Sequence, residues 1–451
     1  MPPPRPKRRR SHNTHTTRRD EAAEGTGERA RLLITGLAHG GVGVGRDADR
    51  LWFVPFTAPG EIVVAEAVDA RAGFVRGRLV EVVTPSALRR PPVCAHFGRC
   101  GGCQLQHMTD EAQRADKAEL VASAFAKVTP ARPSAVVHAE PLAYRARAEL
   151  HVVPDGDGMR LGYRGARSHE VLTPLACPVL EPTLEACVLA LARLVSTVPG
   201  AVPGRYELHV GREGVALCAH IDGTTGREAA RWLGRVLEDI PSLAACAVVD
   251  HGRLRYTLRD GRVHRGDVGY SPGVFGQSHR TLADGLAQEV VQQARPMGQS
   301  VLELYAGAGH LTLPLARQAR RLVTAEENPL ACADARASLE AASLRAEVLQ
   351  GCAARVAQDL VRQGARFDVV VLDPPRKGAA DVLPAVCDLE PARIVYVGCE
   401  PMTAAQDLFA LRPRGYVVTR LSAFDLFPQT FHVEVVAVAE RQGLDHRGGR
   451  K

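Results

Sequence analysis

The sequence predicts a multidomain α/β protein in which a small β-barrel and a central α+β region precede a C-terminal parallel sheet. Three features of the chain support this prediction. A chain of 451 residues is too long for one ordinary hydrophobic core. Short alternating strands and glycine-rich turns fill residues 31–84, as in small closed barrels. From residue 300 onward, strand, glycine loop and helix alternate, which is typical of a parallel sheet covered by helices on both faces.

Residues 1–28 form a segment that is rich in proline and arginine and contains no apolar stretch. We predict a disordered basic tail, which either attracts nucleic acid weakly or only keeps the protein soluble. The segment lacks the apolar core of a secretory signal, and the chain lacks an apolar run of about 18 residues that could span a membrane. A net charge of +7 favours a polyanionic partner. We therefore expect a cytoplasmic monomer that binds no membrane.

Residues 29–88 are predicted to form the barrel. The strand-like stretches are "RLLITGLA", "LWFVPF", "EIVVAEAV" and "GFVRGRLVEVV". Gly40, Gly41, Gly43 and Gly45 predict a tight turn between the first two strands. A small basic barrel suits single-stranded nucleic acid, whose backbone follows a positive groove, but a spacer between domains explains the same residues equally well.

Residues 89–270 are predicted to form a central α+β domain that opens with a cysteine cluster. Cys94, Cys100 and Cys103 are closely spaced, and Cys177 follows far downstream, directly before a proline. Without an export signal, cysteines are expected to be reduced thiols, metal ligands or catalysts, and not a disulfide framework. Zinc ribbons pair two close C-x2-C knuckles, so this spacing favours an iron–sulfur cluster over zinc or free thiols.

The rest of the central region shows no recognisable repeat. Residues 110–128 have a helical pattern, and residues 146–268 mix strands and helices. We expect an α+β insertion between the barrel and the parallel sheet.

In the predicted C-terminal domain, residues 271–445, an apolar strand ends at Tyr305. The next loop contains Gly307 and Gly309 and opens a helix, so the backbone there can approach a ligand closely. Glu326 ends the following strand, where a carboxylate can accept hydrogen bonds from both hydroxyls of a ribose. The third glycine of the dinucleotide fingerprint is absent. This combination favours S-adenosylmethionine, which carries a ribose but no phosphates.

The stretch "VVVLDPPRKG" places Asp373 at the end of another apolar strand. Pro374 and Pro375 remove two amide donors and stiffen the turn, as at the edge of a pocket that holds a planar base. Cys399 ends the next strand, so Asp373 and Cys399 should face one crevice beyond the strand termini. An arbitrary cysteine is more often buried filler, but a place beside a methyl-donor pocket favours a nucleophile.

A nucleophilic thiol suits methylation at carbon 5 of uracil, an atom too weakly nucleophilic to attack a sulfonium methyl unaided. A thiolate that adds to carbon 6 moves electron density onto carbon 5, and a base must later remove the proton at carbon 5. In "FPQTFHVEVV", His432 and Glu434 point to one face of an extended strand. Glu434 is the predicted base, its pKa raised toward neutrality by partial desolvation, whereas a lone strand histidine such as His432 is more often structural.

Together these motifs resemble the RNA (uracil-5-)-methyltransferase family. The resemblance rests on "CAHFGRCGGCQLQH", "VFGQS", "LYAGAG", "LDPPRKG", "VYVGCEP" and "FPQTFHVE". It implies an α/β Rossmann-like methyltransferase domain and a barrel similar to a TRAM domain. Phe275 falls where the family has an aromatic residue near the flipped base. By similarity, the functional positions are the nucleophile Cys399, the base Glu434 and the S-adenosylmethionine-binding residues Gln277, Tyr305, Glu326 and Asp373.

The resemblance also implies a [4Fe-4S] cluster at Cys94, Cys100, Cys103 and Cys177. Family members with both a barrel and a cluster resemble enzymes of 23S ribosomal RNA more than enzymes of transfer RNA. Flipping a base out of its stack costs least in a loop, so a structured RNA loop is the expected target. A transfer RNA enzyme, a base amino-group methyltransferase that needs no thiol, and a non-catalytic iron–sulfur RNA-binding protein remain as alternatives.

The chain departs from the usual family pattern at several places. Gly398 and Glu400 flank Cys399 where the family usually has serine and asparagine. His279 follows the "VFGQS" stretch, and Phe431 replaces a histidine. The thiol, the base and the acid that matches the ribose-binding position are all retained.

Overall fold

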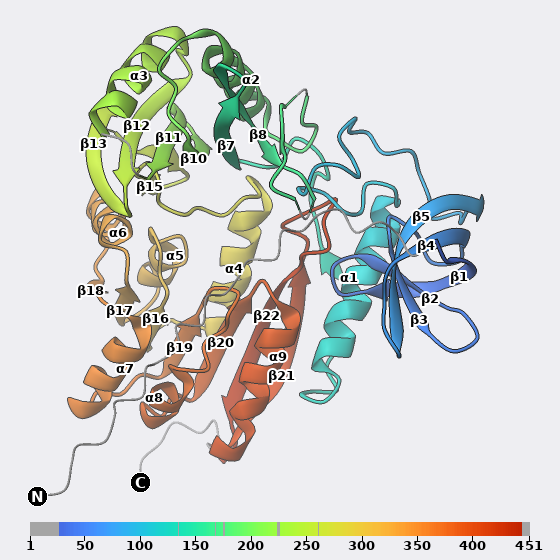
Figure 1. Cartoon of the computed structure of the whole chain (residues 1–451). Helices are drawn as coiled ribbons and strands as arrows, with labels where there is room; N and C mark the ends of the chain where they lie inside the picture. The colour runs from blue at the N-terminus through green and yellow to red at the C-terminus, as the bar shows by residue number, and fades with distance from the viewer. Residues whose placement is uncertain are drawn as a thin grey trace, which may run out of the picture.

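A computed structural model describes residues 27–443 of the chain, except residues 134, 167, 175, 223–225 and 260. The predicted basic tail lies almost wholly outside the described residues. Figure 1 shows a blue barrel to one side, a green α+β layer, and an orange-to-red sheet flanked by helices. Within the described part of the chain, no helix is both long and apolar enough to cross a membrane.

The N-terminal barrel is closed, with strand order β1-β2-β3-β5-β4. Alternate residues point inward, and Ile34, Trp52 and Val63 are fully buried in its core. This confirms the predicted barrel. Its strands are β1 (Arg29–Ala38), β2 (Val42–Arg46), β3 (Leu51–Pro55), β4 (Ile62–Ala70) and β5 (Phe74–Thr84).

The glycines near the first turn have two different roles. Gly40 and Gly41 have φ values of 90° and 69° and form the predicted turn. The prediction was wrong for Gly43 and Gly45, which lie within β2. A Cβ atom on Gly43 would stand 1.9 Å from the Thr57 hydroxyl oxygen, so this glycine permits close packing inside the barrel.

The central region contains a seven-stranded mixed sheet with strand order β13-β12-β11-β10-β7-β8-β9. Helices α2 and α3 cover one face and share its core, which includes Leu191, Trp232 and Leu217. This confirms the predicted α+β character. The elements are β7 (Arg147–Asp155), β8 (Gly158–Arg164), β9 (Val171–Leu172), α2 (Pro182–Thr197), β10 (Gly204–Gly211), β11 (Gly214–Ile221), α3 (Gly226–Asp239), β12 (Leu243–Asp250) and β13 (Arg253–Arg259).

A short hairpin, β14 (Val263–Arg265) and β15 (Val268–Tyr270), joins the central sheet to the C-terminal sheet. The buried carboxylate of Asp334 accepts hydrogen bonds from Arg262 Nε at 2.5 Å and from the Ser271 amide at 2.7 Å. These bonds fix both ends of the hairpin to the helix that carries Asp334.

The C-terminal sheet has eight strands in the order β18-β17-β16-β19-β20-β22-β21-β6. Strands β16 to β20 are parallel, and β22 runs antiparallel between β20 and β21. This confirms the α/β prediction, and the short β6 lies at the edge of the sheet, beside β21. The strands are β16 (Ser300–Leu304), β17 (Arg321–Glu326), β18 (Glu347–Gln350), β19 (Val369–Leu372), β20 (Arg393–Gly398), β21 (Tyr416–Phe424), β22 (Glu434–Arg441) and β6 (Val136–Val137).

Helices cover both faces of this sheet. Alternate strand residues such as Val301 and Val395 pack against α4, while Leu302 and Ile394 pack in the core that α7, α8 and α9 share. Helix α1 packs against α9, toward the barrel (Figure 1). The helices are α1 (Asp110–Phe125), α4 (Leu282–Ala294), α5 (Thr312–Ala316), α6 (Pro329–Ala341), α7 (Ala353–Arg362), α8 (Leu383–Asp388) and α9 (Pro401–Ala410).

Candidate active site

Four predicted site residues stand at the carboxyl edge of the C-terminal sheet. Tyr305 directly follows β16, Glu326 ends β17, Asp373 follows β19 and Cys399 follows β20. The registers pair Leu304 with both Ala325 and Leu372, so these strands end at one level. Ligand sites of parallel sheets form at such an edge.

The strand register also brings the predicted nucleophile and base together. Strands β20 and β22 are antiparallel, with Gly398 opposite Val435. Cys399 follows Gly398 and Glu434 precedes Val435, so the thiol and the carboxyl group come from directly facing positions. Backbone pairing thereby brings together two residues that are 35 positions apart in sequence.

These groups line one cavity of about 620 Å³, which we call the strand-end cavity. All six residues predicted to bind S-adenosylmethionine or to carry the reaction line it, together with Phe275 and Arg376. Its size is within the usual range for small-molecule sites. The predicted site residues in its wall are Gln277, Tyr305, Glu326, Asp373, Cys399 and Glu434.

One end of the strand-end cavity is a backbone cradle around Glu326. Its carboxylate accepts hydrogen bonds from the amide of Gly307 at 2.9 Å and from the amide of Asn328 at 2.8 Å. Tyr305 and Gly307 have φ values of 66° and 56°, so the chain bends sharply after β16. Glycine adopts this backbone conformation without strain, which explains its place in the loop.

Gln277 reaches the strand-end cavity from the segment that follows the β14–β15 hairpin. The guanidinium group of Arg265 donates hydrogen bonds to the main-chain carbonyls of Gln277 and His279. The imidazole of His279 stacks on Tyr144, with ring centroids 4.7 Å apart. His279 therefore packs on Tyr144 and does not line the strand-end cavity.

Two acidic groups lie beside the thiol, the buried Glu434 and the half-buried Asp373, and one cation acts on both the thiol and Glu434. Burial raises the pKa of Cys399 to about 12, and the negative charge of Glu434 adds to this effect. Burial also raises the pKa of Glu434 to about 8 and that of Asp373 to about 7. The guanidinium of Arg376 lowers the pKa of both Cys399 and Glu434. Arg376 is thus placed to favour a thiolate and a carboxylate in this site.

Two residues that line the strand-end cavity, Glu303 and Arg147, were not predicted from the sequence. Glu303 is 1% exposed, and its Oε2 accepts a hydrogen bond from the Thr312 hydroxyl at 2.7 Å. Its two-residue offset from Tyr305 was an available signal, because alternate strand residues share a face. Arg147, whose Cζ lies 5.0 Å from the ring centroid of the exposed Phe275, had no local signal.

The family departures have structural explanations. A Cβ atom on Gly398 would stand 3.1 Å from both Ala404 and Tyr396, which leaves little room for serine. Glu400 lies at the start of α9, and its Oε1 is 3.7 Å from the imidazole of His39 in the barrel. The ring of Phe431 also packs edge-on against His39, at 5.3 Å.

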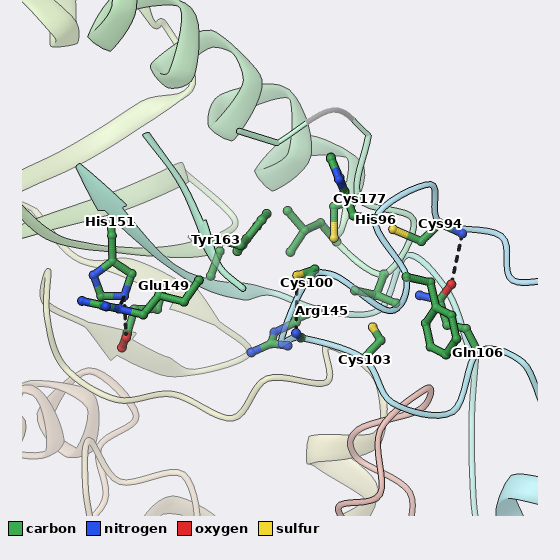
Figure 2. A pocket seen from close by; sticks show the side chains of 16 residues that line it. Cys94, His96, Cys100, Cys103, Gln106, Arg145, Glu149, His151, Tyr163 and Cys177 are labelled. Atoms are coloured by element: carbon green, nitrogen blue, oxygen red, sulfur yellow. Dashed lines mark hydrogen bonds and ion pairs between the residues drawn. The ribbon is translucent and has the colours of Figure 1, made fainter. Parts of the chain in front are cut away.

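The four predicted cluster cysteines line a separate cavity of about 240 Å³, which we call the cysteine cavity. Figure 2 shows sulfur atoms from Cys94, Cys100, Cys103 and Cys177 around this space. Arg145 lines both this cavity and the strand-end cavity. Among the described residues, no group of three or more His, Cys, Asp or Glu side chains converges closely enough to hold a single metal ion.

Comparison with known proteins identifies relatives over nearly the whole chain. A family model described as tRNA (uracil-5-)-methyltransferase matches residues 269–442, and a TRAM domain model matches residues 25–80. A protein of Alkalilimnicola ehrlichii named 23S rRNA (uracil(1939)-C(5))-methyltransferase RlmD is 35% identical, over 92% of this chain and 97% of its own. A protein of the same name from Pseudomonas fluorescens is 33% identical, over 92% of this chain and 94% of its own.

A solved structure supports the fold independently. The tRNA (uracil-54, C5)-methyltransferase of Pyrococcus abyssi, in complex with S-adenosyl-L-homocysteine, superposes with a TM-score of 0.70. It covers 91% of this chain and all of its own chain, at 22% identity. The strand-end residues, the barrel and the full-length relatives agree, and the chain belongs to the RNA (uracil-5-)-methyltransferase family.

Proposed function

We propose that this protein methylates carbon 5 of one uridine in structured 23S ribosomal RNA, with S-adenosylmethionine as the methyl donor. One observation carries the proposal: the β20–β22 register sets Cys399 and Glu434 at facing positions in a cavity that also holds the predicted donor-binding groups. The relatives that match nearly the whole chain are named as 23S rRNA enzymes, which favours ribosomal over transfer RNA. We place the reaction in the cytoplasm, with a monomer as the acting form.

The donor site is assigned to Gln277, Tyr305, Glu326 and Asp373, which line the strand-end cavity. Glu326 lies at the carboxyl edge of the sheet, where its carboxylate can accept hydrogen bonds from ribose hydroxyls. When bound, S-adenosylmethionine supplies an electrophilic methyl group on sulfur. The positive φ at Tyr305 and Gly307 brings the backbone close to this ligand.

Cys399 is assigned as the nucleophile. Its sulfur forms a bond to carbon 6 of the uracil, and the electron pair of the carbon 5–carbon 6 double bond moves to carbon 5, which attacks the methyl group of the donor. The bond between that methyl group and the donor sulfur breaks, and S-adenosylhomocysteine leaves with the electron pair. Because burial raises the pKa of this thiol to about 12, it must lose its proton as substrate enters, and the positive charge of Arg376 favours that loss.

Glu434 is assigned as the base that completes turnover. Its carboxylate takes the proton from carbon 5, the released electron pair reforms the carbon 5–carbon 6 double bond, and the carbon 6–sulfur bond breaks. A carboxyl group that is 5% exposed, with a pKa raised by burial to about 8, is a suitable acceptor near neutral pH.

The cysteine cavity is assigned to a [4Fe-4S] cluster. Four thiols around a common cavity suit a multi-iron cluster better than one ion, which requires sulfur atoms that converge at about 2.3 Å from the metal. When bound, the cluster would join the loop after the barrel to the loop before α2, because Cys94, Cys100, Cys103 and Cys177 come from these two places. Iron and sulfide content of anaerobically purified protein tests the assignment.

Covalent trapping tests the proposed function directly. The protein is incubated with S-adenosylmethionine and 5-fluorouridine-substituted fragments of 23S ribosomal RNA or transfer RNA. Fluorine cannot leave as a proton, so the adduct at Cys399 should persist and identify the substrate. The variant Cys387→Ala, which removes a thiol buried in α8, should still form the adduct, whereas Cys399→Ala should not.

Three other outcomes would overturn the proposal. An adduct with transfer RNA alone would assign the protein to that substrate. Methyl transfer that survives Cys399→Ala would indicate an amino-group methyltransferase. No binding of S-adenosylmethionine at millimolar concentration would indicate a non-catalytic RNA-binding protein.

A further inference from the structure

The segment between β21 and β22, residues 425–433, leads directly into the proposed base, and we call it the base-carrying segment. Its contacts come largely from outside its own sheet. Lys117 Nζ, fully buried in α1, donates a hydrogen bond to the carboxylate of Asp425 at 2.6 Å. The hydroxyl of Tyr144 donates to the Pro428 carbonyl at 3.0 Å. A segment without regular structure depends on such partners to satisfy its backbone.

Gln429 is the central residue of these contacts. It is fully buried and has a φ of 69°. Its carbonyl faces residues 94–105, which carry Cys94, Cys100 and Cys103 and which we call the cysteine loop. That carbonyl accepts hydrogen bonds from the amides of Gln104 at 3.0 Å and Leu105 at 2.9 Å. Gln104 directly follows Cys103, so the backbone of the cysteine loop is bonded to the base-carrying segment.

The side chain of Gln429 makes a second set of bonds to α1 and to the residues before it. Its Oε1 accepts hydrogen bonds from Gln113 Nε2 and Arg90 Nη2, both at 3.0 Å. Its Nε2 donates a hydrogen bond to the carboxylate of Asp110 at 3.1 Å. The main-chain N–H of Gln429 donates to Gln113 Oε1 at 2.9 Å. All of these bonds are at least partly shielded from water, so a missing partner leaves a buried polar group unsatisfied.

We propose that Gln429 is a positioning residue that locks the base-carrying segment to the cysteine loop and α1, and so sets Glu434 opposite Cys399. This inference rests on the proposed function of Glu434 as the base. Gln429 lies five residues before Glu434 and does not line the strand-end cavity. Its loss should therefore affect the step that needs Glu434 more than donor binding or thiol addition.

The affected step has a specific signature. Proton removal at carbon 5 must precede breakage of the carbon 6–sulfur bond, so a misplaced carboxylate leaves methylated RNA attached to Cys399. Ordinary uridine RNA would then show a covalent protein–RNA adduct that the unchanged protein releases quickly. A displacement of about 1 Å at a reacting group can cost on the order of 100-fold in rate.

The test variant is Gln429→Met, which keeps the side-chain volume and removes the hydrogen bonds. We expect turnover to fall about 10- to 100-fold, with an unchanged Kd for S-adenosylmethionine, an unchanged rate of adduct formation with 5-fluorouridine RNA, and accumulation of adduct with ordinary RNA. Gln113→Met removes the reciprocal bonds and should show the same pattern. If Gln429→Met does not fold, Gln113→Met alone decides the question.

The matched control is Thr129→Val. This change removes another buried hydrogen bond near α1, from the Thr129 hydroxyl to the Val418 carbonyl at 3.0 Å. Thr129 follows the C-terminal end of α1, whereas Gln429 bonds to the first turn of that helix. It should lower stability without accumulating adduct. Equal losses of thiol addition and turnover in Gln429→Met, or accumulation in Thr129→Val as well, would overturn the inference alone. If the unchanged protein forms no adduct with 5-fluorouridine RNA, the proposed function fails and the inference fails with it.

Discussion

The strand-end cavity and the cysteine cavity are built in opposite ways. In the strand-end cavity, the reactive side chains follow the ends of paired strands, so backbone ladders fix their spacing. In the cysteine cavity, the thiols come from turns and loops that contain little regular structure. Sheet pairing can therefore preform the first site, whereas the second site needs a bound group or distant contacts to hold its shape.

The two cavities are separate, but two residues link them. Arg145 lines both of them, and Gln429 bonds the cysteine loop to the segment that carries Glu434. On our proposal, chemistry in the strand-end cavity therefore depends on order in the cysteine cavity. The following predictions test how far that dependence goes, beginning with changes confined to the strand-end cavity.

The largest effect is expected for Cys399→Ala. Without the sulfur nucleophile, carbon 5 is not activated, and methyl transfer should fall by more than about 10⁴-fold. Cys399 is only half-buried, so the thermal unfolding midpoint should change little. Transfer of labelled methyl groups to RNA measures the effect, and residual transfer within tenfold of the unchanged protein would contradict it.

Glu434→Gln should lower turnover by about 10²- to 10⁴-fold, the usual contribution of a general base. The thiol remains, so adduct with ordinary uridine RNA should accumulate and be visible by denaturing electrophoresis. This prediction fails if the variant neither forms adduct nor retains turnover, because the carboxyl group would then be needed for the first step.

Cys103→Ser tests the influence of the irregular site on the rigid one. Loss of this thiol should loosen Gln104, which bonds to Gln429, and lower turnover by up to about 100-fold. The Kd for S-adenosylmethionine, measured by calorimetry, should stay within about twofold, because the donor residues follow strand ends. A large loss of donor binding would show that the two cavities are not separable.

The smallest effect is expected from pH. Burial raises the pKa of Glu434 to about 8, so the carboxylate is the minor form at neutral pH. The turnover number kcat should rise by up to about tenfold per pH unit below pH 8 and then level off, because Glu434 acts after methyl transfer; the apparent pKa belongs to the Glu434–Asp373 pair. A profile that falls over this range would contradict the role of Glu434.

The free energy of unfolding should fall over the pH range in which turnover rises. The pKa of Glu434 is raised on folding, so the folded state holds the proton more tightly than the unfolded state. The free energy of unfolding should therefore decrease as pH rises from the unfolded value of 4.5 toward about 8. Urea unfolding of Glu434→Gln should lack this part of the pH dependence.

Much of the strand-end site could be predicted because its residues directly follow strands. Asp373 and Cys399 each end an apolar run, and parallel strands bring such ends to one edge. Gln277 came only from the family resemblance, since its segment has no regular structure. Glu303 could have been predicted as well, because alternate residues of a strand share a face and Glu303 is two residues before Tyr305.

Other features depend on contacts that local sequence does not specify. Gln429 makes hydrogen bonds with six residues that lie between positions 90 and 141, and no spacing in the sequence predicts that they converge on it. Arg145 and Arg147 likewise reach the strand-end cavity only through the packing of the central sheet. Gly43 shows the same limit on a small scale, because its neighbour Thr57 lies on another part of the barrel.

The insertion of β22 between β20 and β21 has a consequence for biosynthesis. Every group proposed to hold the donor, and the proposed nucleophile, is translated before Glu434, which begins the last strand that the described residues form. A nascent chain that still lacks β22 lacks the proposed base, and its β21 has no strand through which to join β20. On the proposed mechanism, completion of the sheet and acquisition of turnover thereby depend on the same strand.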